Sequence, residues 1–370
     1  YYTKRQSINV IGLRKERIGE GKPMPYDVEN LTVSGSYNQV DHRDFEIEDA
    51  FDQNVRLGAT YDFSFAPLSI EPLKNIAVLD SSAYFALLKD FNFNVFPSNI
   101  TATSTIFRQY NEQTFREINL PPGFLNGIPT LYQRNFLFDW QYTINYNFTK
   151  SLRMNFDSST NRIVRNYLDE ENNPDRTTGV WDGFFNVGVP NQHFQSLQVN
   201  YDLPFAKVPV LSFINATYSY TGNFQWERGS EMFQILDDIP NLGNSVQNSN
   251  VHQLNTNLEM QTFYDYVGLK KRAREQAGQS IRERSRAVPT LDPQKPETPS
   301  NAGQAERLSA GDRTYNTIIG LITAIKKVQV NYQENNGIFL PGYTNGIGFL
   351  GTSNPTLAFT LGSQEEVRYM

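Results

Sequence analysis

Apolar and polar residues alternate with a period of two over much of the chain. The clearest run extends from Phe136 to Phe148, where every even position is apolar and five of the six odd positions are polar. Successive side chains of a β-strand point to opposite faces, so this run predicts a strand with one apolar and one polar face. After a short turn at 149–151 the alternation resumes from Leu152 to Asp157, which predicts a hairpin.

The same two-faced pattern recurs before and after this hairpin. It covers 54–65, 196–205 and 214–221, with weaker copies at 31–37, 254–260 and 328–332. The apolar positions change parity between Phe91 to Val95 and Ile100 to Ile106, and a β-bulge near Pro97 would account for this change within one strand. Together these segments predict about nine or ten antiparallel strands.

Long and short connections separate between the two ends of the predicted sheet. The long connections 111–133, 164–193 and 227–249 fall at one end, and the tight turns near Lys150 and Lys207 fall at the other. This arrangement is typical of outer-membrane β-barrels. Two further long connections, 67–90 and 264–326, do not follow the rule. Several strands reach the roughly 9–11 residues that a membrane-spanning strand needs.

The polar face is rich in uncharged side chains. A soluble sheet exposed on one side usually carries many Lys and Glu there, whereas this face is mostly Asn, Gln, Thr and Ser. We therefore expect an all-β fold: an antiparallel transmembrane β-barrel wall segment, with a short helix and long loops, whose polar face lines a hydrated lumen. A soluble β-sandwich or solenoid is the alternative. The chain has no run of about 20 apolar residues, which argues against helical membrane spans.

The alternation assigns individual side chains to these two environments. The lumen-facing candidates are Arg56, Thr60, Asp62, Asp139, Gln141, Asn145, Arg153, Asn155, Gln198, Asn200, Asn215 and Thr217. The lipid-facing candidates are Leu57, Phe63, Phe138, Trp140, Ile144, Leu152, Phe156, Leu197, Val199, Ile214 and Tyr218.

The alternation disappears after residue 263, and this divides the chain. Residues 1–263 are predicted as barrel strands and loops, and 264–311 as a basic, Pro-rich linker that is disordered. Within the linker, residues 270–286 hold seven basic side chains, so a basic arm that contacts anionic lipid or an acidic partner is the alternative. A short amphipathic helix is predicted at 312–326, followed by further strands and a Gly-rich loop at 327–370.

Composition and motifs give little support to bond chemistry. The 33 basic and 39 acidic residues give a net charge of −6, which argues against a nucleic-acid surface. The absence of Cys excludes thiolate metal sites, and three single His residues leave little room for a His-based one. The glycines of 346–351 match the dinucleotide-binding spacing, but no helix is predicted after them. The acidic residues between Asp44 and Asp52 lack the spacing of a calcium-binding loop and are predicted to be a solvated loop. We therefore assign no catalytic, cofactor or metal site and do not expect an enzyme.

Several stretches are more specific than the alternation. They are Tyr1 to Val10, Lys22 to Asn30, Phe138 to Tyr142 and Tyr332 to Tyr343. These stretches resemble the SprA/Sov family, the giant outer-membrane translocon of the type 9 secretion system. The likeness reaches both ends of the chain but does not extend over 270–311. Because the first residue is Tyr1 and no signal peptide is recognisable near it, we expect the chain to be part of a longer protein.

The resemblance implies a function and a set of partners. It implies a part of one very large barrel, of roughly 36 strands, in the outer membrane of a Gram-negative-type cell. Such a barrel would export folded proteins to the cell surface, a process linked to gliding motility, and would have a lateral opening. The implied partners are outer-membrane lipid, secreted cargo proteins, a barrel protein that shuttles cargo and a plug protein, without cofactors or nucleic acid. The alternatives are a smaller outer-membrane solute transporter or porin, and a soluble extracellular β-rich protein that binds glycans or surfaces.

Overall fold

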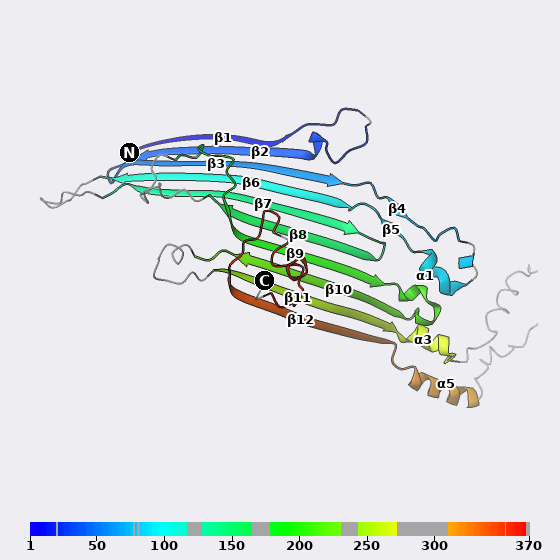
Figure 1. Cartoon of the computed structure of the whole chain (residues 1–370). Helices are drawn as coiled ribbons and strands as arrows, with labels where there is room; N and C mark the ends of the chain where they lie inside the picture. The colour runs from blue at the N-terminus through cyan, green and yellow to red at the C-terminus, as the bar shows by residue number, and fades with distance from the viewer. Residues whose placement is uncertain are drawn as a thin grey trace, which may run out of the picture.

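Ten strands form one antiparallel sheet in which each strand pairs with its neighbours along the chain (Figure 1). The computed structural model describes residues 1–19, 21–76, 78–79, 82–116, 128–164, 178–230, 243–271, 310–351 and 353–367. The strands of the sheet are β1 (Tyr2–Arg14), β2 (Leu31–Arg43), β3 (Ile47–Ser64), β6 (Asn99–Phe115), β7 (Leu131–Asn147), β8 (Leu152–Ile163), β9 (Val189–Leu203), β10 (Ile214–Glu227), β11 (Asn244–Glu259) and β12 (Lys327–Tyr343). The prediction of a mostly β, antiparallel fold with nine or ten strands is confirmed.

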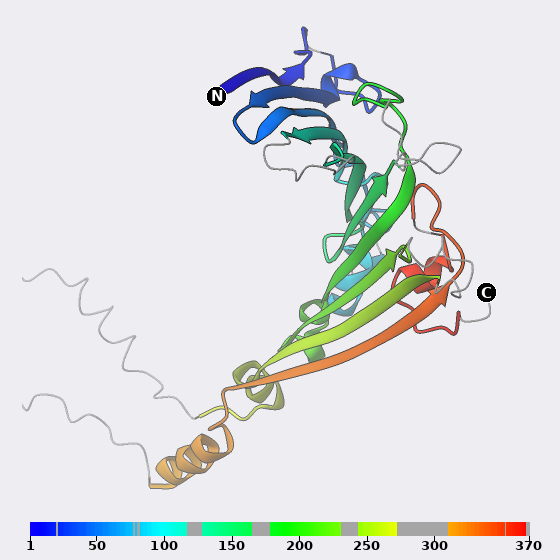
Figure 2. The same ribbon diagram turned by 90° about the vertical axis from the view of Figure 1, so that its left-hand side faces the viewer.

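The sheet is open, with β1 and β12 as its two edges. No described strand joins these edges, so the ten strands do not close into a barrel. Figure 2 shows the sheet bowed across its width, with one hollow, concave side and one convex side. The C-terminal segment after β12 lies on the convex side in this view.

The connections follow the predicted division between the two ends of the strands only in part. We call one end the loop end, because the connections 116–130, 164–188 and 228–243 lie there, together with the tight β2–β3 turn. The other end, the turn end, holds the short turns 148–151 and 204–213. Three long connections that break the rule, 15–30, 65–98 and 260–326, join strands at the turn end as well.

The parity change near Pro97 is a break between two strands, so the prediction of a β-bulge is wrong. Phe93–Asn94 forms β5, which pairs with β4 (Ser69–Ile70) in a separate two-stranded sheet. The long strand β6 begins only at Asn99. Pro97 has no N–H to donate to a strand ladder, which favours a break at this point.

Helices are short and lie outside the sheet. They are α1 (Ala86–Lys89), α3 (Met260–Val267), α5 (Ala310–Ile322) and α6 (Leu357–Thr360), with short 3-10 turns elsewhere. Helix α5 overlaps the helix predicted at 312–326, and α3 crosses the predicted boundary at residue 264. Most of the predicted linker, residues 272–309, lies outside the described residues. Among the described helices, none is long and apolar enough to span a membrane.

Candidate functional site

The strand register decides which side chains share a face of the sheet. Residues directly opposite each other on paired strands point to the same side. One such row runs across seven strands through Asp62, Thr101, Thr143, Asp157, Ser196, Asn223 and Ser249. The adjacent row on the opposite face runs through Phe63, Ile100, Ile144, Phe156, Leu197, Gly222 and Asn250. The sheet therefore has one polar face and one largely apolar face.

The register places all twelve lumen-facing candidates on the polar face and all eleven lipid-facing candidates on the opposite face. The C-terminal segment hydrogen-bonds to side chains of the apolar face, such as Tyr220 to Leu361, so the apolar face is the convex one (Figure 2). The polar face is therefore concave. Which of these faces meets water and which meets lipid remains a prediction.

Cross-strand hydrogen bonds connect side chains on the concave face. The Thr143 hydroxyl donates to Asp157 Oδ1 at 2.7 Å, and the Asn161 amide donates to Asp139 Oδ1 at 2.6 Å. Similar bonds join short hydroxyl and amide side chains, including Ser196 to Asn223 and Ser219 to Asn200. Arg153 lies 2.8 Å from Asp202 in an exposed ion pair. These polar contacts between neighbouring strands add to the main-chain pairing of the sheet.

The convex face is covered near the loop end by two segments of the chain itself. The first, which we call the flap, consists of residues 178–188 and lies over strands β2 to β8. Trp181 of the flap stacks on Tyr37 with ring centroids 5.9 Å apart, and Val180 is fully buried in a cluster with Val55 and Phe136. Both contacts hold the flap against the apolar face.

Two arginines of the convex face donate to main-chain carbonyls of the flap. Arg108 is fully buried and donates from Nη2 to the carbonyls of Phe184 and Asn186 at 3.1 and 2.7 Å. Arg162 donates to the carbonyls of Val187 and Gly188 at 3.1 and 2.8 Å. Each guanidinium would be costly against hydrocarbon, and both are instead bonded to main-chain oxygens.

The second cover, which we call the strap, consists of the described residues of 344–367 and lies over strands β7 to β11. Side chains of four strands donate to its main-chain carbonyls: Trp140 to Phe349 (3.3 Å), Tyr142 to Leu350 (3.4 Å), Gln195 to Thr360, Tyr220 to Leu361 (2.6 Å), Asn248 to Ser363 (2.6 Å) and Asn250 to Gly362 (2.7 Å). Its apolar side chains Ile347, Phe359 and Val367 enter a cluster with Phe224, Trp226 and Val246 of the sheet.

Sequence reasoning missed both covers and the polar residues beneath them. His193, Gln195 and Asn248 are buried on the convex face, each no more than 1% exposed. For His193 and Gln195 the available signal is that they share the parity of Leu197, Val199 and Tyr201 in β9. Asn248 gives no such signal, because Asn244, Asn250 and His252 share its parity in β11. A polar side chain at such a position predicts a local partner, but the alternation does not say which segment supplies it.

The contact between the strap and the sheet also constrains two glycines. A Cβ at Gly222 would collide with the Leu361 carbonyl of the strap, and a Cβ at Gly351 would collide with the His193 ring. Gly351 also has a positive φ of 77°, which disfavours other residues. The glycines of 346–351 thus allow close packing in a coil segment, and the next helix, α6, begins only at Leu357.

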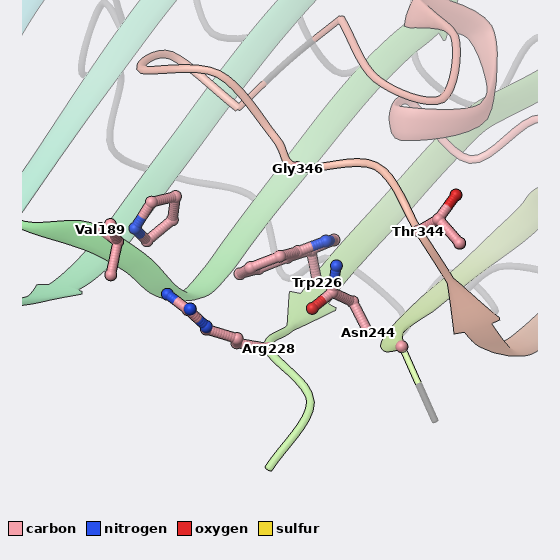
Figure 3. A pocket seen from close by; sticks show the side chains of 8 residues that line it. Val189, Trp226, Arg228, Asn244, Thr344 and Gly346 are labelled. Carbon is pink, nitrogen blue, oxygen red and sulfur yellow. The ribbon is translucent and has the colours of Figure 1, made fainter. Parts of the chain in front are cut away.

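A cavity of about 430 Å³ opens at the loop end, where strands β9 to β12 finish (Figure 3). Its lining residues are Val189, Pro190, Trp226, Arg228, Gly243, Asn244, Thr344 and Gly346. Figure 3 shows the Arg228 side chain extending below the Trp226 ring toward Val189. Among the described residues that line it there is no His or carboxylate side chain.

Polar contacts fix the turns at both ends. At the loop end, Asp44 Oδ1 accepts from the Ile47 and Glu46 amides at 2.7 and 2.9 Å, and these bonds, above all that from Ile47, lower the pKa of Asp44, with a further contribution from His42. At the turn end, the ion pair with Lys207 lowers the pKa of Asp90 and joins two connections that are far apart in sequence. Asp49 and Asp52 lie within β3, so the predicted acidic loop is limited to the turn before it.

The three histidines have structural contacts. His42 lies 3.1 Å from Asp44, His193 lies 2.8 Å from the Thr160 hydroxyl, and His252 lies 2.7 Å from the Tyr218 hydroxyl. They belong to separate strands and are not brought together. Within the described residues, no group of three or more His, Asp or Glu side chains could hold a metal ion.

Comparison with known proteins does not assign the chain to a family. No model of a known protein family matches it, and no curated protein matches it significantly.

Proposed function

We propose that this chain forms part of the wall of a protein-conducting outer-membrane channel of the type 9 secretion system, which exports folded proteins to the cell surface. The observation that carries the proposal is which face of the curved sheet is polar. The concave face is polar and the convex face is apolar. The channel works by passage and gating, without bond chemistry.

The polarity is opposite to that of a soluble β-sandwich or barrel. In soluble β-proteins the apolar face points inward and builds the core, and the polar face points to solvent. A membrane barrel reverses this order, because hydrocarbon surrounds its outer face and water fills its lumen. The concave row of Asp62, Thr143 and Asn223 and the convex row of Phe63, Ile144 and Leu197 fit the membrane arrangement.

The open arc favours a large barrel over a small porin or transporter. Outer-membrane barrels close with as few as 8 strands. Here ten strands leave both edges unpaired among the described residues, and the exposed main-chain groups of β1 and β12 would not be tolerated in hydrocarbon. Further strands are therefore required to complete the wall. The size of the cargo, a folded protein, rests on the resemblance to the SprA/Sov family.

A photo-crosslinking experiment tests passage of protein directly. A photoreactive amino acid is placed at Gln141, which is exposed on the concave face, in the complete protein assembled in secreting cells. We expect crosslinks to secreted polypeptides. The matched control is Ile144, three residues along the same strand and on the convex face, where we expect no such crosslinks.

The outcomes separate the candidate functions. Crosslinks to secreted proteins from Gln141 but not from Ile144 support the translocon. An assembled protein that gives no polypeptide crosslinks at Gln141 contradicts it, and loss of small-solute uptake on blocking the lumen would then favour a porin or transporter.

A further inference from the structure

We propose that only the turn-end half of the convex face contacts the hydrocarbon of the membrane, and that the loop-end half is a collar outside the hydrocarbon, shielded by the flap and the strap. This proposal rests on the proposed function and specifies where its wall meets lipid. It identifies the partner of each half: acyl chains for the uncovered half, and the chain's own segments for the covered half.

The irregular backbone of the strap is the first argument. Apart from the four residues of α6, the described residues of 344–367 form neither helix nor strand. Irregular backbone facing lipid does not occur within the hydrocarbon region, because main-chain groups without partners cost several kcal/mol each. The strap lies on the outer side of the sheet, so it cannot be at the depth of the acyl chains.

The buried polar groups beneath the covers give an independent second argument. Arg108, His193, Gln195 and Asn248 all lie on the convex face in the loop-end half. A charged Arg on the lipid face of a barrel is unfavourable by about 2–4 kcal/mol at the midplane. In the turn-end half of β8 to β10, one row of the convex face consists of Leu152, Tyr201 and Tyr218, without a charged or amide side chain.

The height of the uncovered half matches a bilayer. Strand β10 advances by eight residues from Ile214, at its turn end, to Gly222, where the strap begins to cover it. Eight residues at ~3.4 Å each span about 27 Å. With the usual strand tilt of roughly 40°, the vertical height is about 20 Å, close to the apolar band of ~25 Å found on outer-membrane barrels. The strands themselves, of which β3 has 18 residues, are longer than a membrane crossing requires.

Exposed aromatic side chains border the uncovered half on both sides. Trp181 and Phe185 of the flap are 57% and 77% exposed, and Phe349 of the strap is 50% exposed. At the turn end, Phe96 and Tyr266 are 47% and 57% exposed. Aromatic girdles mark both membrane interfaces of outer-membrane barrels. The flap and strap aromatics would therefore lie at the upper interface, with the rest of the collar above it.

Depth-dependent quenching tests the collar. Single cysteines replace Leu254, on the uncovered half of β11, and Ser353, exposed on the strap, and each carries a fluorescent label in the complete protein reconstituted in lipid vesicles. This chain has no native Cys that would compete for the label. We expect lipids brominated on their acyl chains to quench the label at 254 and not at 353, and aqueous iodide to quench the label at 353 and not at 254. Leu258, on the same face and strand, is a second site in case Leu254→Cys fails to assemble.

The failure of the collar and the failure of the proposed function give different results. Quenching of both labels by brominated lipid overturns the collar and leaves the membrane wall intact. Quenching of both labels by iodide alone overturns the membrane wall, and the collar with it.

Discussion

The covered and uncovered halves of the convex face belong to the same strands but differ in their chemistry. The covered half contains Arg108, which donates to the Phe184 carbonyl of the flap, and Gln195, which donates to the Thr360 carbonyl of the strap. It also contains His193, which is bonded to the Thr160 hydroxyl of the sheet. The uncovered half presents aliphatic and aromatic side chains such as Leu254 and Tyr218, with no described segment of the chain over them. One strand can therefore meet two environments in succession. On the convex face, the boundary between them is the point at which polar side chains replace apolar ones at alternate positions of the strand.

Removing a large side chain gives the largest expected difference between the halves. Phe224 is fully buried beneath the strap, and its ring centroid lies 6.1 Å from that of Phe359. Phe224→Ala leaves a cavity between two protein layers and should cost about 3–5 kcal/mol. Leu254→Ala, in the uncovered half, should cost much less because acyl chains fill the space. The thermal unfolding of both variants in lipid measures the difference, and equal losses would contradict the distinction between the halves.

Introducing a charge distinguishes the uncovered half from the concave face. Ile144→Arg should cost about 2–4 kcal/mol, because the guanidinium would enter hydrocarbon. Asn145→Arg, one residue further on the concave face, should be tolerated. The readout is the amount of folded protein in the outer membrane and its unfolding temperature. The assigned facing would be wrong if the two substitutions impaired assembly equally.

A single methyl group tests the contact between the strap and the sheet. Gly222→Ala places a Cβ against the Leu361 carbonyl and should destabilise the protein by about 1–3 kcal/mol through overpacking. Gly58→Ala is the matched control, since a Cβ there meets only ordinary contacts on the concave face. Hydrogen exchange of the strap peptides should increase in Gly222→Ala alone. Unchanged exchange in the strap would mean that it does not pack on β10 as described.

The smallest expected effect is a pH dependence at one turn. The pKa of Asp44 is lowered in the folded protein by its bonds from the Ile47 and Glu46 amides, so its stabilising contribution is full above the unfolded pKa and is lost as pH falls through the folded pKa. Protection of these two amides, corrected for intrinsic exchange, should therefore decrease below about pH 4. The β7–β8 turn is the control, because its acceptor is the Thr149 hydroxyl, which does not titrate. A parallel loss at both turns would point to a global cause.

The strands and their two faces could be predicted from the sequence, because the alternation of apolar and polar residues shows to which face of the sheet each side chain points. Every candidate from Arg56 to Tyr218 lies on the face that its parity predicts. The covers could not be predicted, because the contacts of the strap join residues more than 100 positions apart, such as Gln195 and Thr360. In addition, the acceptors are main-chain carbonyls, which every residue has, so the sequence does not show which segment supplies them. The break at Pro97 was mistaken for a bulge because both produce the same change of parity.

The most direct test of the central claim is the environment of two adjacent residues in β9, Val199 and Asn200. Their side chains lie on the convex and concave faces of the uncovered half. A nitroxide spin label is attached to a cysteine at each position in the complete protein in lipid, and its collision rates with oxygen and with a water-soluble nickel complex are measured. The account predicts that oxygen relaxes the label at 199 more strongly and that the nickel complex relaxes the label at 200 more strongly. Equal access of the nickel complex to both labels would contradict a membrane wall with a hydrated concave face.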